Sequence, residues 1–568
     1  MIKTAMVTLF LCSRIAFAQG LPAGHPPVDQ DKVPDMTSNI QPMDSEQALA
    51  EVKSTAALID PEPLRSLPVH HNGRIKPLDT LARESILFVS GRYSIFELDA
   101  IQIFFGLAFS QAAPFVEIVE IRDPELRTEL GFLKSKRRFS VFDLERSPLQ
   151  KMAQPLSEKE QKNSRSLSPK EKAILETFQQ VWLARSLIDG SLFLRSIDFS
   201  GLEKNMGEGH TGGPIIENGQ LFLKSMAEGK SASEVAPQLR QAIIAQPLPD
   251  LIRPQMATLE REVFYNKARI FFWAALILFV LGILMIAPIS STWLGFRGVI
   301  GAIVIPVLMI AIGFWLRVTI TGFAPVTNMY GTMLWVSLGV IIFSTVLFVL
   351  YRNKSPTAVL LIASSLLLLL TESLPLTLSP DLDPIVAVLR SNYWLTIHVL
   401  TITISYAAFS AAMVMGNIGL VRMIIYTPER NSEFFKLYSH YAYRMIQLGV
   451  FLITAGIILG GIWADYSWGR FWGWDPKETW ALIADVGFIA ILHARLTGWL
   501  KDFGVLAAAC LAYLLVIMAW YGVNFILAAG LHSYGFSSGG AFAVSVFVGV
   551  QLVIFSVSMA RYWQYRVT

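Results

Sequence analysis

The sequence predicts a polytopic α-helical membrane protein, in which about nine transmembrane helices follow a cleaved signal peptide and a mostly helical extracytoplasmic domain. Three observations predict this class. The 568-residue chain is 53% apolar with a mean hydropathy of +0.48, which is too hydrophobic for a soluble protein of this length. The long apolar runs are confined to the second half of the chain, and the N-terminus has the pattern of an export signal.

Residues 1–18 form the predicted signal peptide. A basic residue, Lys3, precedes a short apolar stretch, and Ala16, Phe17 and Ala18 precede Gln19. The apolar stretch is too short to cross a bilayer. We therefore expect cleavage after Ala18 and export of the chain that follows.

Residues 19–51 are rich in Pro, Asp and Ser and predict a flexible tether. Residues 52–265 contain frequent charges and no apolar run of spanning length, which predicts an extracytoplasmic, mostly helical domain. One helix start is clear: Ser168 at the N-cap, Pro169 at N1 and Glu171 at N3 form a capping box.

Residues 269–568 form the predicted transmembrane domain. A helix needs about 20 apolar residues to cross the hydrocarbon layer. The segments of about that length are 269–288, 297–316, 332–351, 356–372, 394–421, 441–463, 479–498, 504–526 and 541–561.

The basic residues predict the orientation of these segments. If residues 19–265 are exported, the loops near 352–354, 422–440 and 499–503 lie in the cytoplasm, and these loops carry more Lys and Arg than the opposite ones. We expect a multi-pass protein of the bacterial inner (cytoplasmic) membrane, with its N-terminal domain on the periplasmic side. The loop at 464–478, here called the tryptophan loop, falls on that side too.

The tryptophan loop concentrates large rings in a short segment. Trp468, Trp472 and Trp474 occur within SWGRFWGWDPKET at 467–479. Such rings could form an interfacial belt, but a belt spreads its rings over many helix ends. A flat surface that holds a large planar ligand is the alternative. Asp475 and Glu478 also predict a capping box that opens the next helix.

Three histidines of the membrane region are candidate ligands, because a histidine in a spanning region is costly. His398, near the start of its segment, and His532, in the last outer loop, are predicted on the side of the tryptophan loop. Two imidazoles and aromatic rings on one face can bind a haem. His493 is predicted deeper, either as a further metal ligand or as a core histidine bonded to a neighbouring helix.

Charge and cysteine content exclude some classes of function. The net charge of +4 suggests no nucleic-acid partner. The two cysteines are Cys12, in the signal peptide, and Cys510, in an apolar segment, so no disulfide or thiolate metal site is expected.

The stretch WGRFWGWDPKETWALI at 468–483 resembles the tryptophan-rich WWD motif of haem-handling proteins, and its continuation PKETWALI resembles the CcsA (ResC) branch of system II cytochrome c synthases. The stretches APVTNMYGTM (324–333), WLTIHV, LHARL and GLHSYGF are similar to CcsA as well. The resemblance implies haem b as substrate, with His398 and His532 as axial ligands beside Trp468, Trp472, Trp474 and Asp475. His493 would be one ligand of a deeper haem site.

The resemblance also implies partners and a reaction. No ResB-like block and no histidine occur in the first four segments, so a separate ResB (CcsB) polypeptide is expected to complete the deeper site. The implied reaction adds the thiols of a CxxCH motif in apocytochrome c to the haem vinyl groups. The alternatives are a CcmC- or CcmF-like haem chaperone, or a transporter without ligase activity.

RSLPVHHNGRIKPLDTLARES at 65–85 resembles a segment found beside CcsA domains in fused synthases, and its role does not follow from the residues. His70 and His71, beside Arg74 and Lys76, could contact haem propionates or apocytochrome, or could be surface residues.

Overall fold

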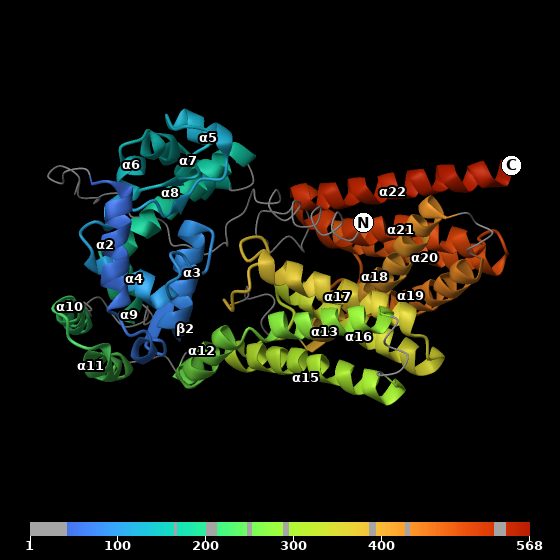
Figure 1. The fold of residues 1–568 in the computed structure, drawn as a ribbon, viewed down its shortest axis with the longest axis horizontal. Helices are drawn as coiled ribbons and strands as arrows, with labels where there is room; N and C mark the ends of the chain where they lie inside the picture. Colours follow the sequence, from blue (N-terminus) through green and yellow to red (C-terminus); the bar gives the residue numbers. More distant parts are fainter. Residues whose placement is uncertain are drawn as a thin grey trace.

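The computed structural model describes residues 43–163, 167–199, 213–246, 253–287, 295–384, 393–426, 432–527 and 541–567. They form an N-terminal domain and a bundle of long helices, and helix α12 (Leu259–Ala268) lies between the two (Figure 1). The predicted signal peptide and most of the predicted tether lie outside the described residues.

The N-terminal domain is mostly helical, which confirms the prediction, and it encloses one hydrophobic core. Two small antiparallel sheets, β1 with β2 and β3 with β4, are added to the helices. The elements are α2 (Ser45–Ala57), β1 (Pro68–His71), β2 (Arg74–Pro77), α3 (Leu78–Ser90), α4 (Ala100–Phe109), β3 (Val119–Glu120), α5 (Pro124–Glu129), β4 (Arg138–Phe139), α6 (Val141–Glu145), α7 (Leu149–Asn163), α8 (Pro169–Ile188), α9 (Ser191–Ile197), α10 (Gly213–Ala227) and α11 (Ala232–Ile244).

The N-terminal domain begins earlier than the predicted boundary at residue 52. Helix α2 starts at Ser45, with the side chain of Asp44 accepting from the Glu46 amide. Ala48 and Val52 are completely buried, so the end of the predicted tether belongs to the domain core. The predicted start of α8 is confirmed, because its N-cap and N3 side chains form the expected reciprocal capping box.

Strands β1 and β2 form a tight hairpin whose register pairs His71 with Arg74. The two turn residues, Asn72 and Gly73, have φ angles of 51° and 76°. An Asn-Gly pair with positive φ at both positions makes the two-residue turn that best fits the twist of a hairpin. The turn therefore projects a short, rigid tip from the N-terminal domain.

Within the described ranges, nine helices are long and apolar enough to span a membrane, and they match the nine predicted segments. A π-helical stretch, Met518–Leu527, continues α21. The helices of the bundle are α13 (Ile270–Ile286), α15 (Phe296–Thr321), α16 (Met329–Tyr351), α17 (Lys354–Ser373), α18 (Tyr393–Ile425), α19 (Ser432–Trp468), α20 (Pro476–Leu496), α21 (Asp502–Ile517) and α22 (Ala541–Val567).

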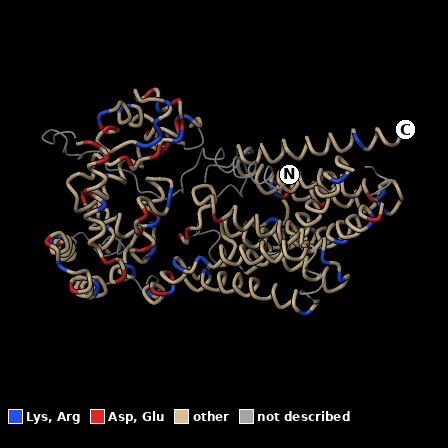
Figure 2. The backbone as a smooth tube through the Cα atoms, in the orientation of Figure 1, with Lys and Arg blue, Asp and Glu red and all other residues tan. Residues whose placement is uncertain are grey.

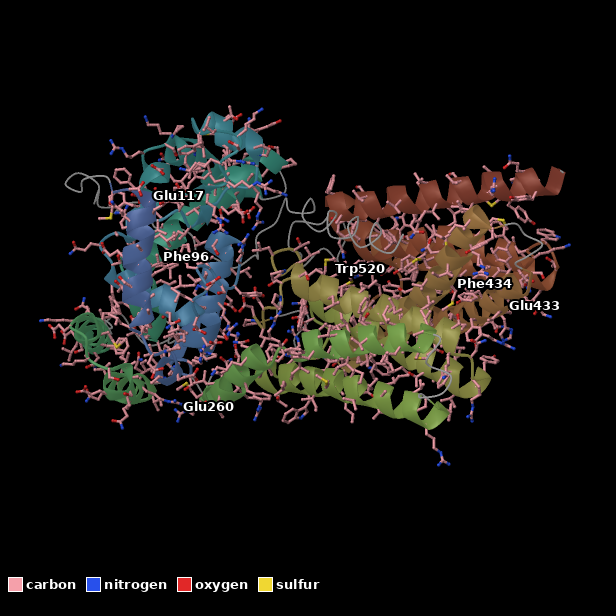
Figure 3. The ribbon with its side chains drawn as sticks, in the orientation of Figure 1. Phe96, Glu117, Glu260, Glu433, Phe434 and Trp520 are labelled. Carbon is pink, nitrogen blue, oxygen red and sulfur yellow. The ribbon has the colours of Figure 1, made fainter. Side chains whose placement is uncertain are left out.

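Charged residues crowd the N-terminal domain and are sparse along the bundle helices (Figure 2). Glu260 of α12 lies where the two parts meet, and Glu433 and Phe434 at the start of α19 lie at the opposite end of the bundle (Figure 3). Tyr351, which ends α16, packs against His440 at that far end. Helix α19 runs back from there, so the tryptophan loop after it lies at the end nearer the N-terminal domain.

Candidate functional site

His398 lies in the second turn of α18 and is held by the neighbouring helix α19. Its Nδ1 lies 2.8 Å from the carbonyl oxygen of Gly456. Because a carbonyl only accepts, Nδ1 carries the proton, and the neutral imidazole has its lone pair on Nε2. Metal-binding histidines commonly donate their other nitrogen to a carbonyl in this way.

Two adjacent glycines of α19 bring His398 and the tryptophan loop to the same place. A Cβ added at Gly460 would lie 2.6 Å from Cε1 of His398, so the imidazole rests on the bare backbone there. The ring of Phe471, in the tryptophan loop, lies in the same way against Gly461. Small residues at helix contacts permit this close approach. The structure therefore brings together two predicted parts of the site.

The rings of the tryptophan loop pack edge to face in two pairs. Trp468 meets the buried Trp463 with centroids 4.6 Å apart, and Trp472 meets Trp474 at 5.8 Å with perpendicular planes. Trp474 is 70% exposed and has a φ of 56°, which a bulky residue seldom adopts. An exposed ring held in a strained conformation is a feature of functional sites.

The turn that follows the rings is fixed by two carboxylates. The Asp475 side chain accepts from the Lys477 amide at 2.9 Å, and Glu478 accepts from the Asp475 amide at 3.2 Å. This reciprocal pair confirms the predicted capping box of α20. Glu478 also accepts from the amide of Gly473 at 2.8 Å, so one carboxylate binds both the helix start and the loop before it.

Arg470 closes the loop on itself. Its Nη1 lies 3.4 Å from Oε1 of Glu478, and its guanidinium lies 5.8 Å from the ring centroid of Trp468. A Cβ added at Gly473 would overlap the Arg470 guanidinium. Arg470 therefore shares Glu478 with the two backbone amides of the turn.

His493 lies far from His398, near the end of α20. Its Nδ1 lies 2.9 Å from the carbonyl oxygen of Ile489 in the same helix, and the side chain is exposed. The α20 end is tied to the far end of the bundle, because Arg495 pairs with Asp502 at 2.6 Å and Ser439 donates to that carboxylate. The alternative of a core histidine bonded to a neighbouring helix is therefore wrong.

His532, the second predicted ligand at the tryptophan loop, lies outside the described residues.

One buried carboxyl was missed in the sequence analysis. Asp485, halfway along α20, is 5% exposed and accepts from the Thr454 hydroxyl at 2.9 Å. A carboxyl within an apolar run was the available signal, because such residues are rare in spanning helices.

The arrangement contains two kinds of group that could hold a planar iron complex. A neutral imidazole supplies a nitrogen ligand for iron, and exposed indole rings bury flat apolar surface. Both kinds of group come together at one end of the bundle, whereas His493 lies at the other.

Comparison with known proteins identifies relatives of this chain. The model of a family described as "Cytochrome C assembly protein" matches residues 270–532. Protein NrfI of Wolinella succinogenes is 28% identical over 499 residues, covering 81% of this chain and 53% of that protein. The cytochrome c biogenesis protein CcsA of Chlamydomonas reinhardtii is 35% identical over 231 residues, covering 38% of this chain and 62% of that protein. CcsA of Guillardia theta is 32% identical over 263 residues, covering 41% of this chain and 84% of that protein. The chain thus spans less than two thirds of the first two relatives.

Proposed function

The chain belongs to the cytochrome c assembly protein family, and from this premise we propose that it acts as the CcsA-type subunit of a system II cytochrome c synthase. In this role it presents haem b at the periplasmic face of the inner membrane and promotes thioether attachment to the CxxCH motif of apocytochrome c. Each thioether forms when a thiol S–H adds across a haem vinyl group, so the attachment needs no cysteine of this chain.

The observation that carries the proposal is the position of His398 beside the tryptophan loop. Its Nδ1–H donates to Gly456, which sets the tautomer and the ring plane, and the adjacent glycines place the loop next to it. We propose that His398 ligates the haem iron from one side and His532 from the other. Trp468, Trp472 and Trp474 would cover the macrocycle, and Asp475 would fix the turn that aims them.

A second haem position is proposed at His493. Its side chain is exposed on the outside of the described bundle, with Leu496 and Trp499 exposed nearby, which leaves this face open to a ligand from another polypeptide. A ResB (CcsB) subunit docked on this face would supply it. His493 would then be the ligand on the path by which haem reaches the tryptophan loop.

The test is the visible spectrum of the purified protein, co-expressed with a ResB-type partner under haem-replete conditions. The parent should show the sharp bands of reduced low-spin haem. His398→Ala and His532→Ala should each reduce or shift these bands. His440→Ala is the matched control, because His440 is a membrane-region histidine that packs against Tyr351 at the far end of the bundle.

Each outcome discriminates between functions. A parent without haem would contradict the proposal and favour a transporter with an aromatic belt. Bound haem without covalent attachment to a co-expressed apocytochrome c would favour a CcmC-like haem chaperone. Attachment that requires His398 and the partner would support the synthase. His493→Ala should lower haem content only when the partner is present.

A further inference from the structure

Two sequence stretches that the proposed function leaves unused meet on one short segment of the chain. They are residues 65–85 of the N-terminal domain and residues 324–333 at the start of α16. The segment is 379–383, which follows α17 and is here called the junction segment. It is bound from one side by the hairpin β1–β2 and from the other by the bundle.

The hairpin binds the junction segment through Asp383. Nδ2 of the Asn72 side chain donates to Oδ2 of Asp383 at 3.2 Å, and Nζ of Lys76 donates to Oδ1 at 3.1 Å. Nε of Arg74 lies 3.6 Å from the same carboxylate. Lys76 is completely buried, and its second partner is Glu84 at 2.7 Å. A buried cation that loses a partner is strongly destabilised, so these contacts hold the hairpin in place.

The same hairpin is fastened to α12, the helix that enters the bundle. Arg74 and Glu262 form two parallel bonds of 2.8 and 2.7 Å, and Glu262 is completely buried. Thr80 donates to Glu262 at 2.7 Å as well. A bidentate pair of this kind fixes orientation as well as distance. The hairpin therefore cannot turn relative to α12 without breaking buried ion pairs.

The bundle binds the junction segment through its backbone. The Asn328 side chain donates to the carbonyl of Ser379 at 3.1 Å, and Nη1 of Arg317 donates to the carbonyl of Pro380 at 3.0 Å. Asn328 is also the N-cap of α16, because its Oδ1 accepts from the Gly331 amide at 2.8 Å. One side chain thus joins the junction segment to the first turn of α16.

Helix α16 extends this connection to the helix that carries His398. The indole nitrogen of Trp335 donates to the carbonyl of Leu400 in α18 at 3.2 Å. Leu400 lies two residues beyond His398. Asn328 and Trp335 belong to one rigid end of α16, so a shift of the junction segment is carried to the backbone beside His398.

We propose that the junction segment is a joint through which the N-terminal domain sets the position of His398. Lys76, Asp383, Asn328 and Trp335 are its positioning residues, and none of them belongs to the haem site proposed above. The effect on haem rests on the proposed function, whereas the effect on the backbone of α18 does not. Coupling of this kind changes an equilibrium by roughly two- to thirtyfold.

The experiment uses the full chain with Asp383→Asn, Trp335→Phe and the double variant. Trp335→Phe keeps an aromatic ring, although a smaller one, and removes the N–H donor. Asp383→Asn keeps the shape of the side chain and removes its charge. The controls are Trp273→Phe, a half-exposed ring on α13, and Asp60→Asn, an exposed carboxyl of the N-terminal domain. Hydrogen exchange of the first turns of α18, in haem-free protein, and haem retention in the loaded protein are both measured.

Each single variant should speed exchange near His398 by roughly two- to thirtyfold. The double variant should show less than the product of the two effects, because both act along one connection. Hydrogen exchange in α18 at the rate of the control variants would contradict the proposed joint. A double variant whose effect equals the product of the two single effects would contradict it as well. A parent that binds no haem would contradict the proposed function, and the exchange result would still decide the joint.

A second variant guards against misfolding of Asp383→Asn. Asn72→Cys/Asp383→Cys introduces one thiol at each of two residues whose side chains are hydrogen-bonded in the parent, and the native Cys510 is buried. The disulfide should restore parental exchange in α18, and mild thiol reduction of the same sample should raise it again. Equal hydrogen exchange in the disulfide-bonded and the reduced sample would contradict the proposed joint.

Discussion

The imidazole of His398 and the backbone of Gly456 form a hydrogen bond of 2.8 Å between helices α18 and α19. One turn further along α19, Gly460 lies under the same ring, with a hypothetical Cβ 2.6 Å from Cε1 and 2.8 Å from Nδ1. The ring is therefore positioned by a donor–acceptor bond and by the missing side chain below it. Both contacts are made by the backbone of α19, so the position of the ring depends on how α18 and α19 lie against each other.

Gly460→Ala should displace this imidazole without changing any ligand. The added methyl group needs the space of the ring, so His398 has to rotate or α18 has to shift. Disturbing the residues that orient a metal ligand typically lowers affinity by about 10–100-fold, and we expect haem retention to fall in that range. Gly301→Ala, on α15 with nothing within 4 Å of the added Cβ, is the control. Equal haem retention in the two variants would show that Gly460 does not determine the position of the His398 ring.

Glu478→Ala should loosen the tryptophan loop. The substitution removes the acceptor of two backbone amides, those of Gly473 and Asp475, and the ion partner of Arg470. Loss of a capping interaction costs about 1 kcal/mol, so the thermal midpoint should fall modestly. The near-ultraviolet circular dichroism of the tryptophans should fall more than the far-ultraviolet signal does. Glu433→Ala, an exposed first-turn carboxyl at the start of α19, should leave both signals unchanged.

Trp474→Gly should separate stability from binding. Trp474 has a φ of 56°, and a left-handed conformation costs a non-glycine residue about 1–2 kcal/mol. Glycine removes that cost, so the melting temperature of haem-free protein should stay level or rise, while haem retention should fall because an exposed ring is lost. Trp472→Gly provides the comparison, since Trp472 does not have positive φ and glycine there should only destabilise. A lower melting temperature for Trp474→Gly would contradict this account.

The fold could be predicted from the sequence largely because its strongest signals are local. An apolar run of spanning length specifies a transmembrane helix by itself, since the bilayer leaves few alternatives for the backbone. The helix starts at Ser168 and Asp475 are likewise specified by three or four neighbouring residues. The boundary at residue 52 was less accurate, because the polar residues of the first turns of α2 hide a buried face that only packing reveals.

The candidate site could be predicted only in its residue types. His398 and the tryptophans are unusual residues for their positions, but their relation depends on which helices are neighbours. The contact of His398 with Gly456 joins residues 58 positions apart, and no local pattern specifies that pairing. The same holds for Lys76 and Asp383, which are 307 positions apart. His70 and His71 were considered as contacts for propionates, and the charges of Arg74 and Lys76 beside them are buried in ion pairs.

The stability of the N-terminal domain should fall as the pH rises from about 5 to 8. Burial raises the pKa of Glu84 to about 8, against the attraction of Lys76 and with a further contribution from Asp381. The ordinary value in an unfolded chain is 4.5, so the folded state holds its proton more tightly. Stability from this group is complete below the unfolded value and is lost as the pH rises through the folded value. A difference of one pH unit corresponds to about 1.4 kcal/mol, so the loss is on the order of a few kcal/mol.

Other groups that face Glu84 act in a different range of pH. Lys76 and Arg74 lower the pKa of Asp383 despite its burial, so the stability that Asp383 contributes is lost only as the pH falls below its ordinary value of 3.8. Burial and the charge of Lys76 lower the pKa of His70 from 6.5, which acts in the opposite direction between pH 5 and 7. The difference between the thermal midpoints of the parent and of a Glu84 variant, measured from pH 5 to 8.5, therefore reports on Glu84. Glu84→Gln, which stays neutral, should give a flatter profile than the parent and should lose its advantage below pH 5. A profile that has the same slope in the parent and in Glu84→Gln would show that Glu84 is ionised in the folded protein and paired with Lys76 throughout this range.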